Sequence, residues 1–176
     1  MSYLIDACVL SEVRRRSAQA TAWLREVDPA ALFLSVITVG EIAKGVAVRE
    51  RTDPVAAAAL GRWLDRLRQL YPDRILAVDD AVATAWGHLM AQRSFPVPDG
   101  LIAATARVHN LTLVTRNVAD FADAGVDVAN PWGGVGRHPP RCSRVSPCPA
   151  ASPRPSARWL ADYSTGPASP ERWLPA

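Results

Sequence analysis

Short apolar runs separated by longer amphipathic stretches recur through the first 132 residues of the chain. Each run is continuously apolar instead of alternating with polar residues, which is typical of strands that are covered on both faces. The pattern predicts strands at Tyr3–Asp6, Leu32–Val36, Ile75–Val78, Leu111–Val114 and Val126–Val128.

The stretches between these runs have helical spacing. The clearest follows Pro54, where Leu60, Trp63, Leu64 and Leu67 recur at intervals of three and four. Further helices are predicted from Ala7–Leu10 into the basic triplet 14–16, over Ala18–Val27, from Thr38 to about Val48, from Ala81 to about Ser94, and from Asp99 onward. Strands that alternate with helices of this length pair in parallel. We therefore expect a three-layer α/β domain whose central parallel sheet has four or five short strands flanked by helices.

The composition changes after Trp132. Residues 133–176 hold 9 of the 15 prolines, are rich in Arg and Ser, and show no apolar periodicity. Such a segment buries too little apolar surface to offset the entropy lost on ordering. We expect one domain over residues 1–132 and a disordered tail over residues 133–176, to which the sequence assigns no role.

The net charge of +3 comes from the tail. Residues 1–132 carry 14 basic and 15 acidic side chains, whereas residues 133–176 carry 6 and 2. The three cysteines, Cys8, Cys142 and Cys148, lack the spacing of a zinc site or a disulfide framework. No stretch reads as a signal peptide or a membrane span, so a cytoplasmic protein is expected.

Four acidic residues occupy related positions in this pattern. Asp6 ends the first strand, Glu41 lies on the helix after the second, Asp99 begins a helix, and Asp120 follows the fourth strand. In an open parallel sheet, ligands bind at the carboxyl ends of the strands. We therefore expect the three aspartates to converge there, with Glu41 reaching in from its helix.

Four carboxylates in one pocket repel one another, and a divalent cation resolves that repulsion. Mg²⁺ prefers hard oxygen ligands and keeps several waters, which leaves room for a phosphate group. A cation held in this way can activate a water molecule and stabilise the leaving oxygen. The pattern indicates a metal-dependent phosphodiesterase.

Each acid also has an ordinary explanation. Asp6 and Asp99 are plausible helix caps, Glu41 could be one charge on an amphipathic helix, and Asp120 could face solvent in a short turn. A phosphatase with Asp6 as nucleophile is disfavoured, because that chemistry usually needs a second aspartate where Cys8 stands.

The order of the motifs adds a further indication. The segments Y-L-I-D-A-C-V-L-S-E, S-V-I-T-V-G-E-I-A-K-G, P-V-P-D-G-L-I-A-A-T-A, L-T-L-V-T-R-N-V-A-D-F and V-A-N-P-W follow one another through residues 1–132. In this, the chain resembles the PIN-domain ribonucleases of bacterial toxin–antitoxin modules, the VapC toxin family.

The resemblance implies roles for particular residues. Asp6, Glu41, Asp99 and Asp120 match the family's metal-binding acids, with Thr115 and Asn117 as polar neighbours. It further implies cleavage of RNA, often tRNA or ribosomal RNA, that depends on Mg²⁺ or Mn²⁺. Members are usually homodimers and are inhibited by a cognate, VapB-like antitoxin.

Three departures from the family pattern stand out. Ala7 and Cys8 replace the threonine and asparagine of the usual D-T-N, Gly100 replaces an alanine or serine, and the tail extends past the Asn-Pro-Trp. Glycine should weaken the start of its helix by up to ~1 kcal/mol. These departures leave open a second function, a weakened PIN domain that binds its antitoxin and, through it, operator DNA.

RNA contacts are less defined, because the domain lacks a basic and aromatic surface motif. For the basic triplet, a solvated helix end is an equal alternative. The candidates for phosphate contacts flank the acidic motifs and are Arg14, Arg15, Arg16, Lys44 and Arg116.

Overall fold

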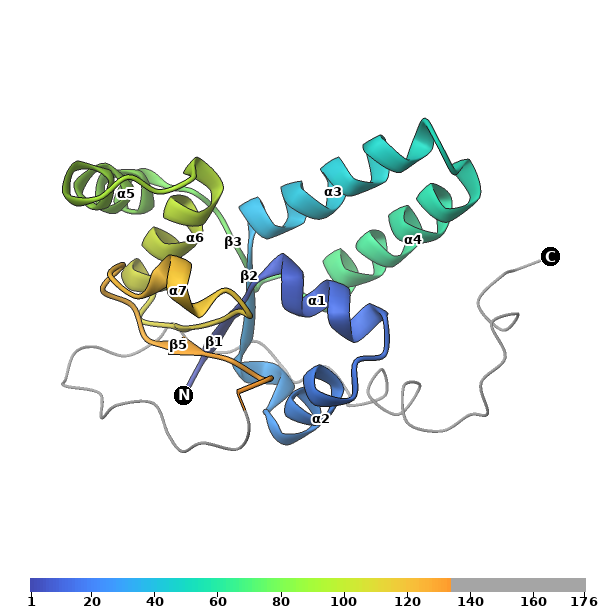
Figure 1. Ribbon diagram of the computed structural model, residues 1–176, viewed down its shortest axis with the longest axis horizontal. Helices are drawn as coiled ribbons and strands as arrows, with labels where there is room; N and C mark the ends of the chain where they lie inside the picture. The colour runs from blue at the N-terminus through green and yellow to red at the C-terminus, as the bar shows by residue number, and fades with distance from the viewer. Residues whose placement is uncertain (134–176) are drawn as a thin grey trace.

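A five-stranded parallel sheet forms the centre of the computed structural model, which describes residues 1–133 (Figure 1). The strands run in the order β3-β2-β1-β4-β5, so the first strand of the chain lies in the middle. Their bounds are β1 Tyr3–Ile5, β2 Leu32–Ser35, β3 Ile75–Leu76, β4 Thr112–Val114 and β5 Val128–Ala129. The parallel pairing predicted from the strand-helix alternation is confirmed.

Seven α-helices within residues 1–133 cover the two faces of the sheet. Helices α1 to α4 lie on one side and α5 to α7 on the other (Figure 1), which confirms the predicted three-layer architecture. Their bounds are α1 Ala7–Arg14, α2 Ala18–Glu26, α3 Val36–Glu50, α4 Pro54–Leu70, α5 Asp80–Gln92, α6 Val97–Val108 and α7 Val118–Phe121, with a short 3-10 turn at Pro29–Ala31.

The core is split by the sheet into two apolar clusters. Ile5 packs with Val9 of α1 and Leu64 of α4, whereas its neighbour Leu4 packs with Ile102 of α6 and other residues of the opposite side. Successive residues of a strand point to opposite faces. Both faces of β1 are therefore buried, which accounts for the continuous apolarity of this strand.

Helix starts differ from the predictions where a capping residue fixes the first residue of the helix. Helix α3 begins at Val36, two residues before the predicted start, because the Ser35 hydroxyl accepts the Ile37 N–H and caps the helix directly at the end of β2. Helix α5 begins at Asp80, one residue before the predicted start, and is capped by Asp79, whose carboxylate accepts the Val82 N–H. The four-residue helix α7 was not predicted, because so short a segment has no periodicity to detect.

No helix within residues 1–133 is long and apolar enough to cross a lipid bilayer. The predicted tail, apart from Gly133, lies outside the described residues. That the tail is disordered and does not stabilise the domain therefore stays a prediction.

A chain ending at Trp132 is expected to melt at the temperature of the full chain, because residues 133–176 have no core-forming pattern. A chain ending at Asn130 should melt about 5 °C lower, because it loses Trp132, which packs against the α1 to α4 cluster. Thermal unfolding followed by circular dichroism measures both. A lowered melting temperature for the first truncation would contradict the prediction.

Candidate active site

The carboxyl ends of β1 and β4 bring Asp6 and Thr115 together. Ile5 pairs with Val114 in the sheet, so the next residue of each strand meets its counterpart. The buried Thr115 hydroxyl donates a hydrogen bond of 2.6 Å to Oδ2 of Asp6, and it accepts the Asn117 N–H at 3.1 Å. One oxygen of the Asp6 carboxylate is thus oriented by a residue 109 positions away.

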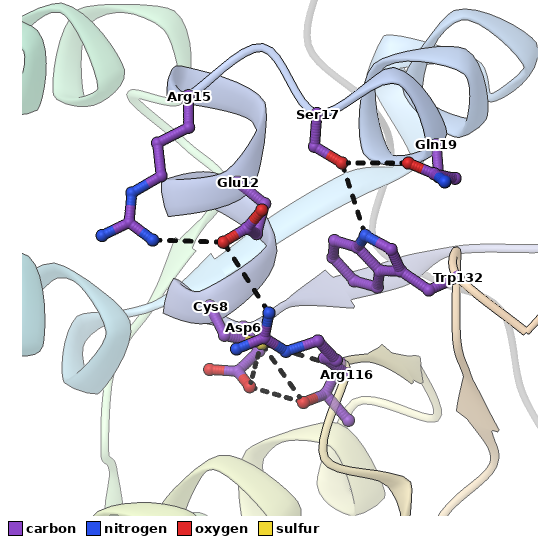
Figure 2. Close-up of polar contacts among 9 residues, drawn as sticks. Asp6, Cys8, Glu12, Arg15, Ser17, Gln19, Arg116 and Trp132 are labelled. Atoms are coloured by element: carbon purple, nitrogen blue, oxygen red, sulfur yellow. Dashed lines mark hydrogen bonds and ion pairs between the residues drawn. The ribbon is translucent and has the colours of Figure 1, made fainter.

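Cys8 lies in the first turn of α1 and points at the same carboxylate (Figure 2). Its thiol donates to Asp6 Oδ2 at 3.1 Å, lies 3.5 Å from the Thr115 hydroxyl, and accepts the Arg116 N–H at 3.4 Å. Burial, and secondarily the charge of Asp6, raise the pKa of Cys8 to about 11. The thiol is therefore neutral at physiological pH and acts on Asp6 as a weak donor.

The alternative explanation of Asp6 as a helix cap holds for its position but not for its side chain. Asp6 stands at the N-cap position of α1, yet its side chain makes no capping hydrogen bond. The carboxylate turns instead to Thr115 and Cys8. This direction suits a residue that binds something at the edge of the sheet.

Glu41 and Asp99 lie in the electric field of the other acids. The pKa of the half-buried Glu41 is raised by burial first and then by the charges of Asp6 and Asp99, while Lys44 lowers it. The pKa of Asp99 is raised by burial first and then by Asp6 and Asp120. The charges of the aspartates therefore disfavour ionisation of their neighbours, which places all four acids around one region.

The alternative for Asp99 is wrong, and that for Asp120 is right about its exposure but wrong about the turn. Asp99 is not an N-cap: it lies in the first turn of α6, whose N-cap is Pro96. Asp120 is exposed, but it belongs to helix α7 and not to a turn. The positive end of the α6 dipole thus lies near the Asp99 carboxylate.

The acids surround the site without closing on it. Within residues 1–133, no three side chains among His, Cys, Asp and Glu lie close enough to hold a metal ion as placed. The predicted convergence is therefore looser than an assembled ligand set, as expected of like charges that repel one another. The donors are carboxylate oxygens, which fit Mg²⁺ or Mn²⁺, and their role as ligands stays a prediction.

The predicted phosphate contacts fall into two groups. Lys44 acts on Glu41 and Arg116 adjoins Thr115, so both lie beside the acids. Arg14 instead lies over the ring of Trp63 of α4, and Arg16 follows the end of α1 with a positive φ of 61°. Arg15 is paired with Glu12 at 3.2 Å.

Sequence reasoning assigned no role to two residues beside the site, Glu12 and Trp132. Glu12 forms ion pairs with Arg15 and, at 3.7 Å, with Arg116 (Figure 2). Trp132 packs its ring near Arg116. Glu12 follows Cys8 by four residues, and this spacing places both on one face of a helix, which is a signal that could have found it.

Gly100 also has a structural explanation. It lies in the first turn of α6, beside Asp99, and a Cβ there would stand 3.1 Å from two ring atoms of Trp86 and 3.3 Å from the Met90 sulfur. The glycine that weakens the helix by propensity is therefore the residue that lets α5 and α6 approach each other.

Gly100→Ala is expected to leave the melting temperature unchanged or lower it, because the clash with Trp86 opposes the gain in helix propensity of up to about 1 kcal/mol. Gly87→Ala is the matched control: Gly87 lies on α5, and a Cβ added to it would meet nothing within 4 Å beyond its own helix backbone, so this change should be stabilising. Thermal unfolding of both variants measures the difference. Equal stabilisation by the two changes would show that Trp86 exerts no constraint.

Comparison with known proteins agrees with this fold and these motifs. The PIN domain family model matches residues 3–126. Toxin FitB of Neisseria gonorrhoeae is 34% identical over 140 residues, which cover 73% of this chain and 97% of FitB. VapC ribonuclease Y4jK of Sinorhizobium fredii is 31% identical over 139 residues, covering 73% of this chain and 96% of the relative.

A solved structure of FitAB bound to a DNA fragment superimposes with a TM-score of 0.70. It is 30% identical and covers 77% of this chain and 99% of the matched chain. The predicted resemblance is therefore confirmed by sequence and by fold. The chain belongs to the PIN-domain family, among the VapC-type toxins that carry ribonuclease names.

Proposed function

We propose that the protein is a Mg²⁺-dependent endoribonuclease, the toxin of a toxin–antitoxin module, which cleaves RNA of the tRNA or ribosomal RNA class. The observation that carries the proposal is the group of four carboxylates at the carboxyl edge of the sheet, where burial and then the charges of neighbouring acids raise the pKa values of Glu41 and Asp99. The ribonuclease name of a relative that covers the same part of the chain supports it.

Asp6, Glu41, Asp99 and Asp120 would hold the cation. When bound, Mg²⁺ or Mn²⁺ supplies an activated water and stabilises the charge that develops on the phosphate and the leaving oxygen. Thr115 and Cys8 hold one oxygen of Asp6, Oδ2, and so direct the carboxylate toward the site. Preorganisation of this kind is how residues beyond the ligands contribute to a metal site.

Incubation of total RNA with the purified protein, with Mg²⁺ or with a chelator, tests the function. New 5′ ends mapped by sequencing should appear only with the metal and should be absent with a variant that lacks one of the four acids. Induced expression followed by the same mapping identifies the RNA and the cleavage site. Cleavage that continues in the chelator would contradict the proposal.

The proposed partners follow from the same assignment. A VapB-like antitoxin would hold the toxin inactive, and the toxin would form a homodimer and act on RNA in the cytoplasm. The structure of FitAB bound to a DNA fragment, to which this chain is similar, supports a complex that binds DNA.

A second function is favoured by one observation. Cys8, in place of the family's asparagine, gives Asp6 only a weak donor. A PIN domain weakened in this way could serve to bind its antitoxin and, through it, operator DNA. Such a protein would form the complex yet leave RNA intact in Mg²⁺, which separates it from the nuclease.

A further inference from the structure

Arg116 follows strand β4 and contacts two residues of helix α1. Its backbone N–H donates to the Cys8 sulfur at 3.4 Å, and its guanidinium reaches Glu12, one turn further along α1, at 3.7 Å. The Glu12 side chain is only 19% exposed, whereas that of Arg116 is 55% exposed. The guanidinium is therefore anchored at one end and open to solvent beside the acidic site (Figure 2).

Trp132 supports the same guanidinium from another direction. The Arg116 Cζ lies 6.0 Å from the centre of the Trp132 ring, within the range of a cation–π contact. The ring is itself held, because its Nε1–H donates to the Ser17 hydroxyl at 3.3 Å and its backbone N–H donates to the Asn130 side chain at 2.9 Å. The Asn-Pro-Trp segment thus fixes a side chain that adjoins Asp6.

The charges of this group favour an anion. Glu12 is shared by two guanidiniums, Arg116 and Arg15, so the three side chains together carry a net positive charge. A guanidinium has five N–H donors in a planar fork that matches the oxygens of a phosphate. The ion pair with Glu12 joins only one nitrogen of Arg116 to the carboxylate.

We propose that Arg116, held between Glu12 and Trp132, binds a phosphate of the RNA strand next to the acidic site, and that Trp132 is a positioning residue for this contact. The proposal rests on the proposed function for the identity of the ligand. Trp132, which is 126 positions from Asp6 in the sequence, would thus contribute to RNA binding beside the acidic site.

RNA binding without cleavage tests the proposal. The full chain carrying Asp99→Asn, in buffer without divalent metal, is titrated with a labelled oligo-uridine of about 12 nucleotides, a length typical of single-strand binding sites. The dissociation constant is measured over a series of KCl concentrations. Each phosphate contact contributes about 0.7 to the slope of log K against log salt for a single strand.

Arg116→Ala should weaken binding about tenfold and flatten the slope by about 0.7. Trp132→Leu should weaken it about threefold, whereas Trp132→Phe, which keeps a ring under the guanidinium, should stay close to the parent. Arg68→Ala is the matched control, because Arg68 is similarly exposed at 49% and is also paired with an acid, Asp65. It lies near the end of α4, at the amino edge of the sheet, and should leave the slope unchanged.

The double variant Arg116→Ala with Trp132→Leu tests whether Trp132 affects RNA binding through Arg116. If Trp132 acts through Arg116, Trp132→Leu should have no further effect once Arg116→Ala is present. If Trp132→Leu weakens binding equally in the parent and in Arg116→Ala, Trp132 is merely structural and the proposal is overturned. The proposal is also overturned if Arg116→Ala and Arg68→Ala give the same slope of log K against log salt. If Trp132→Leu fails to fold, Ser17→Ala, which removes only the partner of the indole N–H, replaces it in the same cycle.

Failure here is distinguishable from failure of the nuclease function. The binding measurement contains no cleavage step, and cleavage by the parent chain in Mg²⁺ is assayed separately. Cleavage with no dependence of the slope on Arg116 would overturn this proposal alone. An Arg116-dependent slope without cleavage would uphold it and overturn the nuclease.

Discussion

Asp99→Asn is expected to abolish RNA cleavage in Mg²⁺, with a loss of at least about 100-fold. Removal of a group that only supports a metal ligand typically costs about 10- to 100-fold, so loss of a ligand should cost more. Asp6→Asn should have the same effect, although its amide oxygen can still accept the Thr115 hydroxyl. The measurement is the single-turnover cleavage rate as a function of Mg²⁺ concentration.

The fold should survive this change. The pKa of Asp99 is raised in the folded chain, which means that its ionised form is less favourable there than in the unfolded chain. At a pH above this raised pKa, the charge opposes folding, and the asparagine removes that charge. The metal-free variant should therefore melt at the parent's temperature or slightly higher, the gain being small because Asp99 is only partly buried and solvent screens its charge.

Asp73→Asn is the control for charge removal. Asp73 is exposed and lies just before β3, at the amino edge of the sheet and away from the four acids. This variant should cleave RNA at the parent's rate. Cleavage by Asp99→Asn at the rate of the Asp73 control would remove Asp99 from the metal site.

The sheet, and the edge of it at which Asp6 and Thr115 meet, were predictable from local pattern. A continuous apolar run marks a strand buried on both faces, and parallel strands place their carboxyl ends at one edge. Asp6 and Thr115 both follow such runs, and they meet because β1 and β4 are neighbours. The order of the strands, and hence this pairing, required the family resemblance or the structure, because apolarity alone does not specify which strands pair.

The contacts that complete the site link residues far apart in the sequence. Arg116 meets Cys8 and Glu12, and Trp132 meets Ser17, each across more than 100 positions. The periodic pattern of apolar residues does not indicate contacts between residues so far apart in the sequence. The same holds for Gly100, whose lack of a side chain is explained only by the approach of Trp86 from the neighbouring helix.

The contacts of Cys8 with Asp6 and Arg116 can be tested by their effect on RNA cleavage. Its sulfur occupies the place where a side chain can donate to Asp6 and accept the Arg116 N–H at once. A neutral thiol does both weakly, and its pKa of about 11 keeps it neutral. An asparagine amide has a stronger donor and a stronger acceptor in one planar group, so it can serve both partners better.

The double change Ala7→Thr with Cys8→Asn is therefore expected to raise RNA cleavage in Mg²⁺ by at least about tenfold, within the 10- to 100-fold range of residues that orient metal ligands. The gain should come mostly from tighter metal binding, because a better-held Asp6 needs less rearrangement when the cation binds. Cleavage rates measured against Mg²⁺ concentration should shift to lower concentrations of the metal.

Cys8→Ala sets the lower limit of the series. It removes the sulfur contacts with Asp6, Thr115 and the Arg116 N–H, and it should cleave more slowly than the parent. Activity should therefore rise from alanine through cysteine to asparagine at position 8. Each variant is compared at equal folded fraction, determined by thermal unfolding. If the curves of the double variant and the parent superimpose, Cys8 already orients Asp6 as well as an amide would, and the departure from the family motif carries no loss of activity.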